Sequence, residues 1–473
     1  MPKHLKDNTK RYVNTRPRCS SCLKKDEEIY RLREKVHRLE ADKRALQQKL
    51  QEGYFGSSTP SSRKPFKPNS DSAPVEKKNG GAQIGHRGHG RSSVQSHEAD
   101  VVQLLETDTV CPKCGVALEN LGTKGRTVID IVPVQVQKIV YQRRRRHCPQ
   151  CHRFFSAKAP GVLPKFKHGN MLLAHAAIDH YLHGIPIKRV AQRLGIGAGA
   201  LIESLHRLAD RLKGVPEKLI ASYRQAHRKH ADETTWRNDG HNWQAWLFCT
   251  PELSIFRLRK TRAASVVKEV FGQHPLPGVL GVDRYAAYNA APCAKQYCYA
   301  HLLRHVKDLG SEFPHRPEVQ DFVNTAAPLV AEAMRLRSTV ISDEAFYRQA
   351  ELLKDEIQYV MRMPAKHPGI QHIQTIFQEH APRLYQWAND RSIPADNNLA
   401  ERDLRQLVIA RKISFGSQSV KGAHTREILM TTLVTLRKHC GQQVMPRLKA
   451  CLDQLAQPGK HDPYQLLFAA DTS

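Results

Sequence analysis

The chain has 473 residues, more than one ordinary domain needs, so several folding units are expected. Hydrophobic residues make up 40% of it, enough for buried cores, and Lys and Arg outnumber Asp and Glu by 74 to 45. A net charge of +29 attracts polyanions, of which nucleic acid is the commonest. The sequence has no apolar stretch long enough to cross a bilayer, and its polar start lacks the apolar core of a signal peptide, so we expect a cytoplasmic protein.

The first 52 residues are predicted to form an N-terminal arm with a long helix over residues 26–52. Two interpretations fit this helix: a short coiled coil that joins copies into a homo-oligomer, or a helix that packs on its own protein. Residues 53–100 are rich in Gly, Ser and Pro and lack apolar periodicity, so they are predicted to be a flexible linker. The helix over residues 26–52 is indicated by the heptad spacing of its seam, which consists of Ile29, Leu32, Val36, Leu39, Lys43, Leu46 and Leu50.

Two Cys-x-x-Cys pairs, separated by 33 residues, follow the linker. Four thiolates supply the tetrahedral site that structural zinc prefers and leave no open position for catalysis. A redox pair is the alternative interpretation. The stretch 127–141 between the pairs has a strand-like pattern. We therefore predict a zinc ribbon over residues 101–160, with Zn²⁺ bound by Cys111, Cys114, Cys148 and Cys151.

A basic segment overlaps the predicted ribbon. Residues 131–178 contain nine Lys or Arg and no acidic residue. A solvated surface has the same composition, but we interpret the segment as a surface that contacts DNA phosphates. The centre of this surface is the run Arg143, Arg144, Arg145 and Arg146.

Residues 161–225 are predicted to be a helical, helix-turn-helix-like DNA-binding region. Residues 187–194 and 201–212 have helical patterns and flank a glycine-rich turn. Any two amphipathic helices joined by glycines share this pattern. The segment is therefore either a DNA-recognition motif or simply a pair of packed amphipathic helices. The second helix carries its apolar positions in register at Leu201, Leu205, Leu208 and Leu212.

Beyond His230 the periodicity changes to that of strands. Residues 242–250 and 253–260 are predicted to be neighbouring strands. Residues 262–271 are predicted to form a helix, and 278–283 a buried strand. This order indicates an α/β layer. Residues 301–390, in contrast, have an almost wholly helical pattern.

Three acidic residues in this part of the chain are candidate metal ligands: Asp232, Asp283 and Glu401. Asp283 ends the most hydrophobic predicted strand, where an open sheet presents its ligands. Glu401 is in helical register with Leu404 and Val408, so its carboxylate is expected on a buried face, which is costly unless it is paired or metal-bound. Two-metal phosphodiester cleavage requires such carboxylates. Acidic residues are common, so spacing alone does not single out this triad.

Several ordered motifs resemble those of the bacterial insertion-sequence-66 transposase family. The resemblance covers nearly the whole chain, and the Asn-Asn-x-Ala-Glu-Arg string that ends at Arg402 is specific. Val282, Arg284 and Tyr299 depart from the family's usual Ser, Gly and Trp, but no carboxylate is lost. The motifs are 231–236 (Ala-Asp-Glu-Thr-Thr-Trp), 282–288, 297–301, 395–402, 411–412 and 415–417 (Phe-Gly-Ser), with 85–88 and the cysteine pairs upstream.

The resemblance implies a multidomain α/β protein whose ribonuclease-H-like catalytic domain contains an α-helical insertion. The core would comprise residues 226–300 and 391–473, the latter with C-terminal helices, and the insertion residues 301–390. The activity implied is that of a DDE transposase, which binds the ends of a mobile element and carries out metal-dependent strand cleavage and strand transfer. Asp232 and Asp283 would hold one Mg²⁺ or Mn²⁺ ion, and Glu401 would complete the site of a second.

The resemblance also implies the partners of the chain. These are double-stranded DNA at the element ends, target DNA, further copies of the chain and accessory transposition proteins, and the protein would be associated with the nucleoid. Asp396 is predicted to be a helix N-cap, and Cys298 and His301 to have a packing or DNA-positioning role. Two alternatives to the transposase are a non-catalytic DNA-binding regulator and a structure-specific nuclease of the same fold. In the transposase interpretation, contacts with DNA backbone phosphates are expected from four basic residues that follow Glu401, namely Arg402, Arg405, Arg411 and Lys412.

Overall fold

The computed structural model describes residues 135–469, together with 109–110, 112–117 and the single positions 25, 28, 29, 32, 36 and 102. The chain divides into two units, Phe66–Gln142 and Met1–Pro65 with Arg143–Ser473. The predicted linker lies outside the described residues, as does most of the predicted coiled coil, although its four described positions are helical. Within the described residues, no helix is long and apolar enough to span a membrane.

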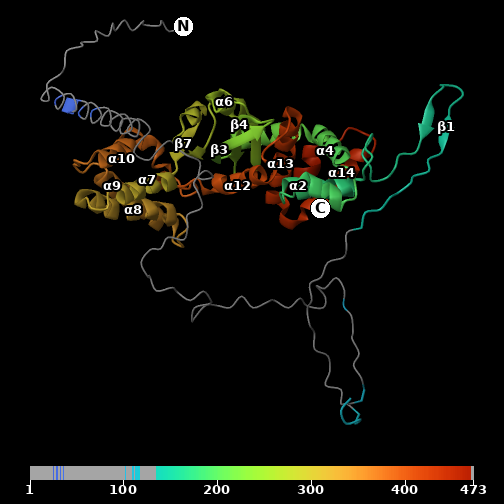
Figure 1. Ribbon diagram of the computed structural model, residues 1–473, viewed down its shortest axis with the longest axis horizontal. Coiled ribbons are helices and arrows are strands. Elements are labelled where there is room, and N and C mark those ends of the chain that lie inside the picture. The colour runs from blue at the N-terminus through green and yellow to red at the C-terminus, as the bar shows by residue number, and fades with distance from the viewer. Residues whose placement is uncertain are drawn as a thin grey trace, which may run out of the picture. The chain divides into compact units, whose positions relative to one another are not determined.

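A five-stranded mixed sheet lies between helices in the larger unit, where β3, β4 and β7 are labelled (Figure 1). Its strand order is β5-β4-β3-β6-β7. The first three strands form an antiparallel meander, while β6 and β7 run parallel to β3. The strands predicted near 242–250, 253–260 and 278–283 are confirmed, as is the helix near 262–271. The elements are β3 (Arg228–Asn238), β4 (His241–Cys249), β5 (Ser254–Arg259), α6 (Ala264–Phe271), β6 (Val279–Val282), η2 (Ala286–Ala290) and β7 (Ala294–Tyr297).

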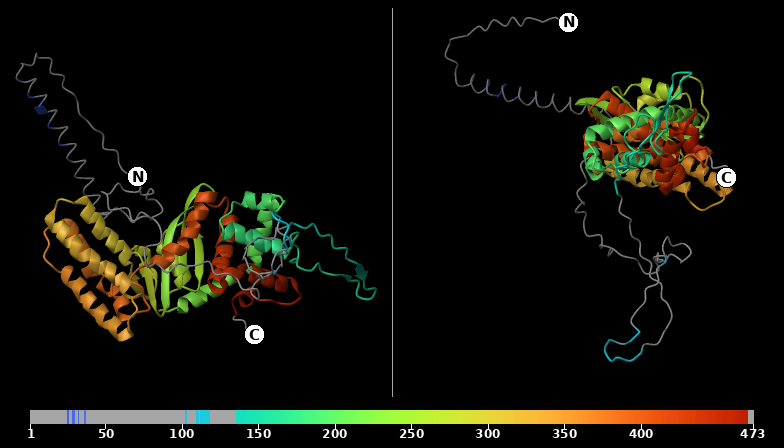
Figure 2. Two further views of the ribbon diagram at one scale, coloured as in Figure 1. Left: turned by 90° about the horizontal axis from the view of Figure 1, so that it is seen from below. Right: turned by 90° about the vertical axis from the view of Figure 1, so that its right-hand side faces the viewer.

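Two groups of helices flank the sheet on opposite sides (Figures 1 and 2). The first group follows β7 and confirms the predicted helical block. It consists of α7 (Tyr299–Glu312), α8 (Pro317–Leu336), α9 (Asp343–Val360), α10 (Pro368–Glu379), η3 (Ala381–Arg383) and α11 (Gln386–Asn389). The second group consists of α2 (Asn170–Tyr181), α3 (Ile187–Arg193), α4 (Ala198–Leu212), α5 (Val215–Gln225), η4 (Gly441–Gln443), α14 (Val444–Ala456) and α15 (Pro463–Phe468).

Two long helices, α12 (Asn398–Ser414) and α13 (Val420–Cys440), complete the α/β layer: α12 packs against β3 and β4, and α13 against β5. Aromatic residues fill the space between the sheet and α5 and α6. The ring centroids of Phe248 and Phe271 are 5.9 Å apart, and those of Tyr223 and Phe271 are 5.4 Å apart, in both cases edge to face. These rings anchor β4 to α5 and α6.

The two helices predicted at residues 187–194 and 201–212 are present as α3 and α4, which pack together across a short glycine-containing turn. The predicted apolar face of α4 is buried, with every one of its four leucines at most 2% exposed. The strand pattern predicted for residues 127–141, between the cysteine pairs, is wrong over the described residues 135–141. Residues 135–144 form no strand, and the short hairpin of β1 (Arg145–His147) and β2 (Phe154–Ser156) follows them.

Side chains of α13 satisfy the backbone of the edge strand β5. The N–H groups of Ser254, Phe256 and Leu258 donate to Thr435 Oγ1 (3.1 Å), Thr431 Oγ1 (3.0 Å) and Glu427 Oε1 (2.5 Å). The strand spacing of two residues matches the helix spacing of four, because each advances the chain by about 6 Å. An edge strand with free N–H groups invites pairing with other chains, and α13 removes that risk.

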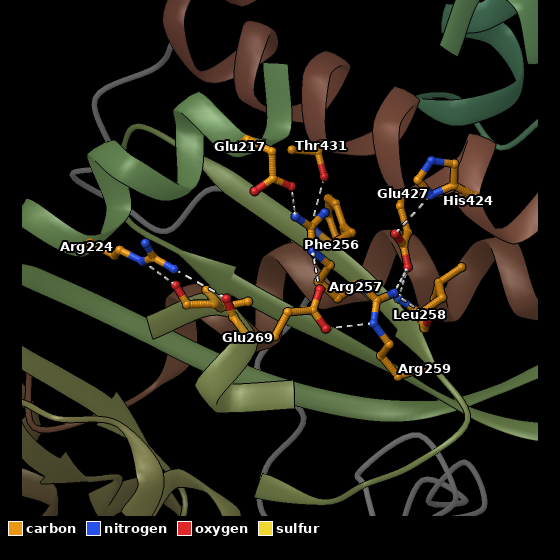
Figure 3. A network of polar contacts seen from close by, with 11 residues as sticks. Glu217, Arg224, Phe256, Arg257, Leu258, Arg259, Glu269, His424, Glu427 and Thr431 are labelled. Carbon is orange, nitrogen blue, oxygen red and sulfur yellow. Dashed lines mark hydrogen bonds and ion pairs between the residues drawn. The ribbon is translucent and has the colours of Figure 1, made fainter. Parts of the chain in front are cut away.

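Charged side chains reinforce the same junction (Figure 3). Arg257 contacts Glu217 of α5 at 2.8 Å, and Arg259 contacts Glu269 of α6 at 2.9 Å. Arg259 also pairs with Glu427, which is 4% exposed at its side chain. Carboxylates on three helices therefore hold the two arginines of β5, and this fixes the outer edge of the sheet.

The β5–α13 junction can be tested with two neighbouring threonines. Thr431→Val leaves the buried N–H of Phe256 without an acceptor, so we expect a loss of about 1–3 kcal/mol in unfolding free energy. Thr432→Val is the matched control. Its hydroxyl donates to the Ile428 carbonyl inside the same helix, so its loss leaves no N–H group of β5 without an acceptor. Equal shifts of the urea midpoint for the two variants would contradict this account of β5.

Candidate active site and zinc site

The sheet register brings two of the predicted acidic residues to neighbouring strands. β3 and β6 pair in parallel through His230 and Gly281, and Asp232 and Asp283 are each two residues further along the chain. Asp232 therefore lies in the middle of β3, and Asp283 directly after the buried strand β6. The predicted position of Asp283 at a strand end is confirmed. A side chain at Gly281 is excluded, because its Cβ would lie 2.9 Å from His230 Nδ1.

The third acidic residue, Glu401, lies in the first turn of α12. The residue that fixes this turn is Asn397, which is 1% exposed and is the N-cap of α12. Its amide donates to the Ala231 carbonyl at 2.9 Å, and its Oδ1 lies 2.8 Å from His230 Nδ1. The N-cap is thus Asn397 and not Asp396 as predicted, although the Asp396 carboxylate accepts from the Asn398 N–H at 3.0 Å.

The hydrogen bond to Asn397 also determines the state of His230. Burial lowers the pKa of His230 to about 4, so the ring is neutral at physiological pH. Because Oδ1 of Asn397 can only accept, the ring must carry its proton on Nδ1 and donate it. This pair joins β3 to α12 one turn before Glu401.

The electrostatics of the site centre on Asp232, whose pKa responds to burial and to the acidic residues around it. Burial, followed by the charges of Glu233 and Asp283 and, more weakly, Glu401, raises the pKa of Asp232 well above its usual range. Burial also raises the pKa of Asp283, against the N–H of Tyr285 and nearby arginines. Among the described residues, none of the three predicted carboxylates forms an ion pair. Half-buried acids without a counter-ion are a donor set suited to divalent cations.

A fourth carboxylate, Glu233, was not predicted. Its neighbour Asp232 points to the opposite face of β3, as strand alternation requires. Arg262 Nε donates to Glu233 at 3.0 Å, and the Tyr288 hydroxyl also donates to it. Arg262 lies over the ring of Tyr285, whose hydroxyl donates to the Arg262 carbonyl at 2.5 Å. Because Glu233 has its own partners, it fixes the segment after Asp283 and is not left free for a metal.

Cys298 and His301 lie beside Glu401. One ligand atom from each of the three residues falls within 4.8 Å of the others. Burial raises the pKa of the Cys298 thiol to about 12, and its Sγ accepts from the Asn397 N–H at 3.2 Å. A neutral, hydrogen-bonded thiol fits the predicted packing role. The group could hold a soft divalent ion only after the thiol loses its proton.

The predicted DNA-contacting residues of α12 do not all have the same surroundings. Arg402, Arg405 and Lys412 are exposed. Arg411 is half-buried, and its guanidinium donates to Thr234 Oγ1 at 3.1 Å and to Thr235 Oγ1 at 2.6 Å. Arg411 thus holds α12 against β3.

Two cysteines of the predicted zinc site lie in the turn between β1 and β2. Hydrogen bonds from the backbone and then the side chain of Cys151 lower the pKa of the Cys148 thiol. A lowered thiol pKa favours the thiolate that binds zinc. Cys114 is exposed, and Cys111 lies outside the described residues. The run Arg143–Arg146 ends within β1 and is exposed throughout.

Comparison with known proteins assigns the family. Residues 165–425, more than half of the chain, match the model of the Transposase IS66 family, so the chain belongs to this family. Residues 108–152 match the zinc-finger binding domain of transposase IS66, which contains all four predicted zinc ligands. The first match contains Asp232, Asp283 and Glu401.

Two relatives come from Sinorhizobium fredii (strain NBRC 101917 / NGR234). Uncharacterized protein y4jD is 23% identical over 365 residues, which cover 68% of this chain and 70% of the relative. Uncharacterized protein y4hP is 22% identical over 388 residues, which cover 71% of this chain and 68% of the relative. Neither name states an activity.

The residues that sequence reasoning missed are those that position the carboxylates. Asn397 belongs to a quoted motif, but its partners His230 and Ala231 are more than 160 residues away in the sequence. A polar residue directly before a predicted helix was the available signal, and it was assigned to Asp396. Glu233 could have been recognised only by placing Asp232 in a strand, because alternation then turns Glu233 to the other face.

The zinc-finger assignment predicts a metal content. The parent protein should contain one zinc per chain, because four thiolates close a structural site. The double variant Cys111→Ser, Cys148→Ser should lose this zinc, as measured by elemental analysis of the purified protein. Cys249→Ser, at a buried cysteine of β4, is the control and should retain it. Equal zinc in the parent and the double variant would contradict the assignment.

Proposed function

We propose that this protein is a DDE-type DNA transposase that cuts and rejoins the ends of a mobile element. The observation that carries the proposal is the arrangement of Asp232, Asp283 and Glu401. A parallel strand pair and the first turn of α12 supply them, within a chain of the Transposase IS66 family. Burial is the largest cause of the raised pKa of Asp232, and the charges of Asp283 and Glu401 are among those that add to it, which supports a shared site for cations.

We further propose that the catalytic domain is ribonuclease-H-like. An antiparallel meander with two parallel strands added beside its first strand supports this assignment. The helices α7–α11 stand between β7 and α12, which is the place expected for an insertion before the last acidic residue. The insertion explains why 118 residues separate Asp283 from Glu401 in the sequence.

In this proposal each carboxylate has a defined task. Asp232 and Asp283 would offer oxygens to one Mg²⁺ or Mn²⁺ ion, and Glu401 would offer its carboxylate to a second. When bound, such ions would supply activation of the attacking oxygen and stabilisation of the leaving oxygen of a phosphodiester. The Asn397 bonds hold Glu401 at a fixed distance from β3, and Arg262 holds the segment behind Asp283 through Glu233 and Tyr285.

DNA at the element ends and at the target is the proposed partner. The zinc-finger match, the exposed run Arg143–Arg146 and the paired helices α3 and α4 support binding that precedes chemistry. The net charge of +29 supports a large ionic share in that binding. Synapsis of two ends requires more than one copy of the chain, so we also propose a homo-oligomer, assisted by accessory proteins and acting at the nucleoid.

The carboxylates are predicted to be essential for chemistry and dispensable for DNA binding. Asp232→Asn, Asp283→Asn and Glu401→Gln keep side-chain shape but remove charge from the metal site, so Mg²⁺-dependent nicking of terminal DNA should fall by about three orders of magnitude or more. Affinity for the same DNA without metal should be unchanged or slightly higher, because repulsion from phosphate decreases.

Asp396→Asn is the matched control, because an amide oxygen can still accept from the Asn398 N–H. It should retain most activity. Glu401→Gln that nicks as fast as the parent would overturn the DDE assignment in favour of a non-catalytic regulator. A parent that nicks terminal DNA but never joins the freed 3′ end to a target would indicate a structure-specific nuclease.

A further inference from the structure

Phe415 is an exposed aromatic residue in a strained backbone conformation. It follows the last residue of α12, and 77% of it is exposed to solvent. Its φ is +56°, in the left-handed region, where glycine is the usual residue after a helix. Both the exposure and the backbone angle are unfavourable for folding. A residue that is costly in two ways and packs little indicates a role outside the folded chain.

The loop that carries Phe415 is held firmly on both sides. The Phe415 N–H donates to the Arg411 carbonyl at 2.8 Å. Beyond it, the Ser417 N–H donates to the Arg237 carbonyl at 2.9 Å, and Trp236 Nε1 donates to Ser417 Oγ at 3.2 Å. Gly416 has φ +113°, and a Cβ there would lie 2.0 Å from the Arg237 oxygen. The strained position is therefore imposed by the β3–β4 hairpin, and Phe415 is displayed in one place.

Phe415 directly follows α12, and the helical backbone up to Ser414 places its Cα on the same side of the helix as Glu401. Fourteen residues separate them, which is close to four turns of 3.6 residues and about 20 Å along the axis. Arg405 and Lys412 fall on the same face between them. Both are exposed, and neither forms an ion pair within the described part of the chain. From the candidate metal site outward, this face thus presents a carboxylate, two free cations and an aromatic ring.

We propose that Phe415 inserts between bases of the DNA substrate, about six base pairs from the reacting phosphodiester, at 3.4 Å per base pair. The inference rests on the proposed function. Arg405 and Lys412 would contact backbone phosphates along the way, and the ring would stack on bases that it partly unstacks. Free cations beside the ring favour DNA over an apolar protein surface as its partner. A rigid wedge would fix the register of the duplex relative to Glu401.

The test combines affinity with a local probe of base stacking. The probe is a duplex from the DNA that flanks the coding region, with 2-aminopurine placed at successive positions. The parent should increase the fluorescence at one step about six base pairs from its own nick. Phe415→Ala should abolish the increase and weaken binding by about 5- to 150-fold. Phe415→Tyr should restore both, because it keeps the ring.

Two further variants separate stacking from folding. Phe415→Gly should bind DNA as weakly as Phe415→Ala. Its melting temperature should nevertheless lie at least about 2 °C above that of the parent, because glycine relieves the backbone strain. Tyr359→Ala removes another exposed aromatic, on α9, and should leave binding unchanged. If Phe415→Ala binds and nicks DNA as strongly as the parent and gives the same fluorescence, this inference is overturned, while the proposed function stands. A Phe415→Gly variant that melts below the parent would assign Phe415 to folding. A parent that does not bind the duplex would overturn the proposed function as well.

Discussion

The side chain of Asn397 joins segments that are far apart in the sequence. It donates to the carbonyl of Ala231 and accepts from the ring of His230, while its own N–H donates to the thiol of Cys298 at the start of α7. All of these groups are buried, so each bond would leave an unsatisfied polar group if it were lost. These bonds fix the first turn of α12 relative to β3, and they therefore also fix Glu401, which lies in that turn. Gly281 completes the arrangement, because only a residue without Cβ lets β6 approach His230.

This construction gathers acidic side chains whose charge no ion pair within the described residues neutralises. Glu233 is compensated by Arg262 and Tyr288, whereas Asp232, Asp283 and Glu401 have no ion pair with a described residue. Burial first, and then the charges of Glu233, Asp283 and, more weakly, Glu401, raise the pKa of Asp232. A rigid scaffold that holds repelling acids together stores an affinity for cations, because a bound divalent ion relieves both burial and repulsion. The same scaffold continues along α12, where Arg411 ties the helix to β3 and leaves the opposite face open.

Local patterns predicted much of this fold, because they depend on neighbours in the sequence. The apolar face of α4, the strand before Asp283 and the helical block after β7 each follow from periodicity alone. The strand β3 was not delimited, since its alternation is obscured by Lys229, His230 and Glu233, polar residues that are buried inside the protein. The triad itself required the motif resemblance. Its convergence depends on a parallel strand register and on the hydrogen bonds of Asn397, neither of which leaves a local pattern. Phe415 belongs to the Phe-Gly-Ser motif, but the motif does not show that its ring is exposed.

Strand β3, the end of β6 and the first turn of α12 are proposed to form one divalent-metal centre. The most direct measurement is diffraction from crystals grown with Mn²⁺, with data collected to locate the metal by its anomalous scattering. The account predicts a peak between the carboxylates of Asp232 and Asp283, and a second within reach of Glu401 when DNA is present. A peak bound only by Cys298, His301 and Glu401, with Asp232 and Asp283 uninvolved, would contradict it.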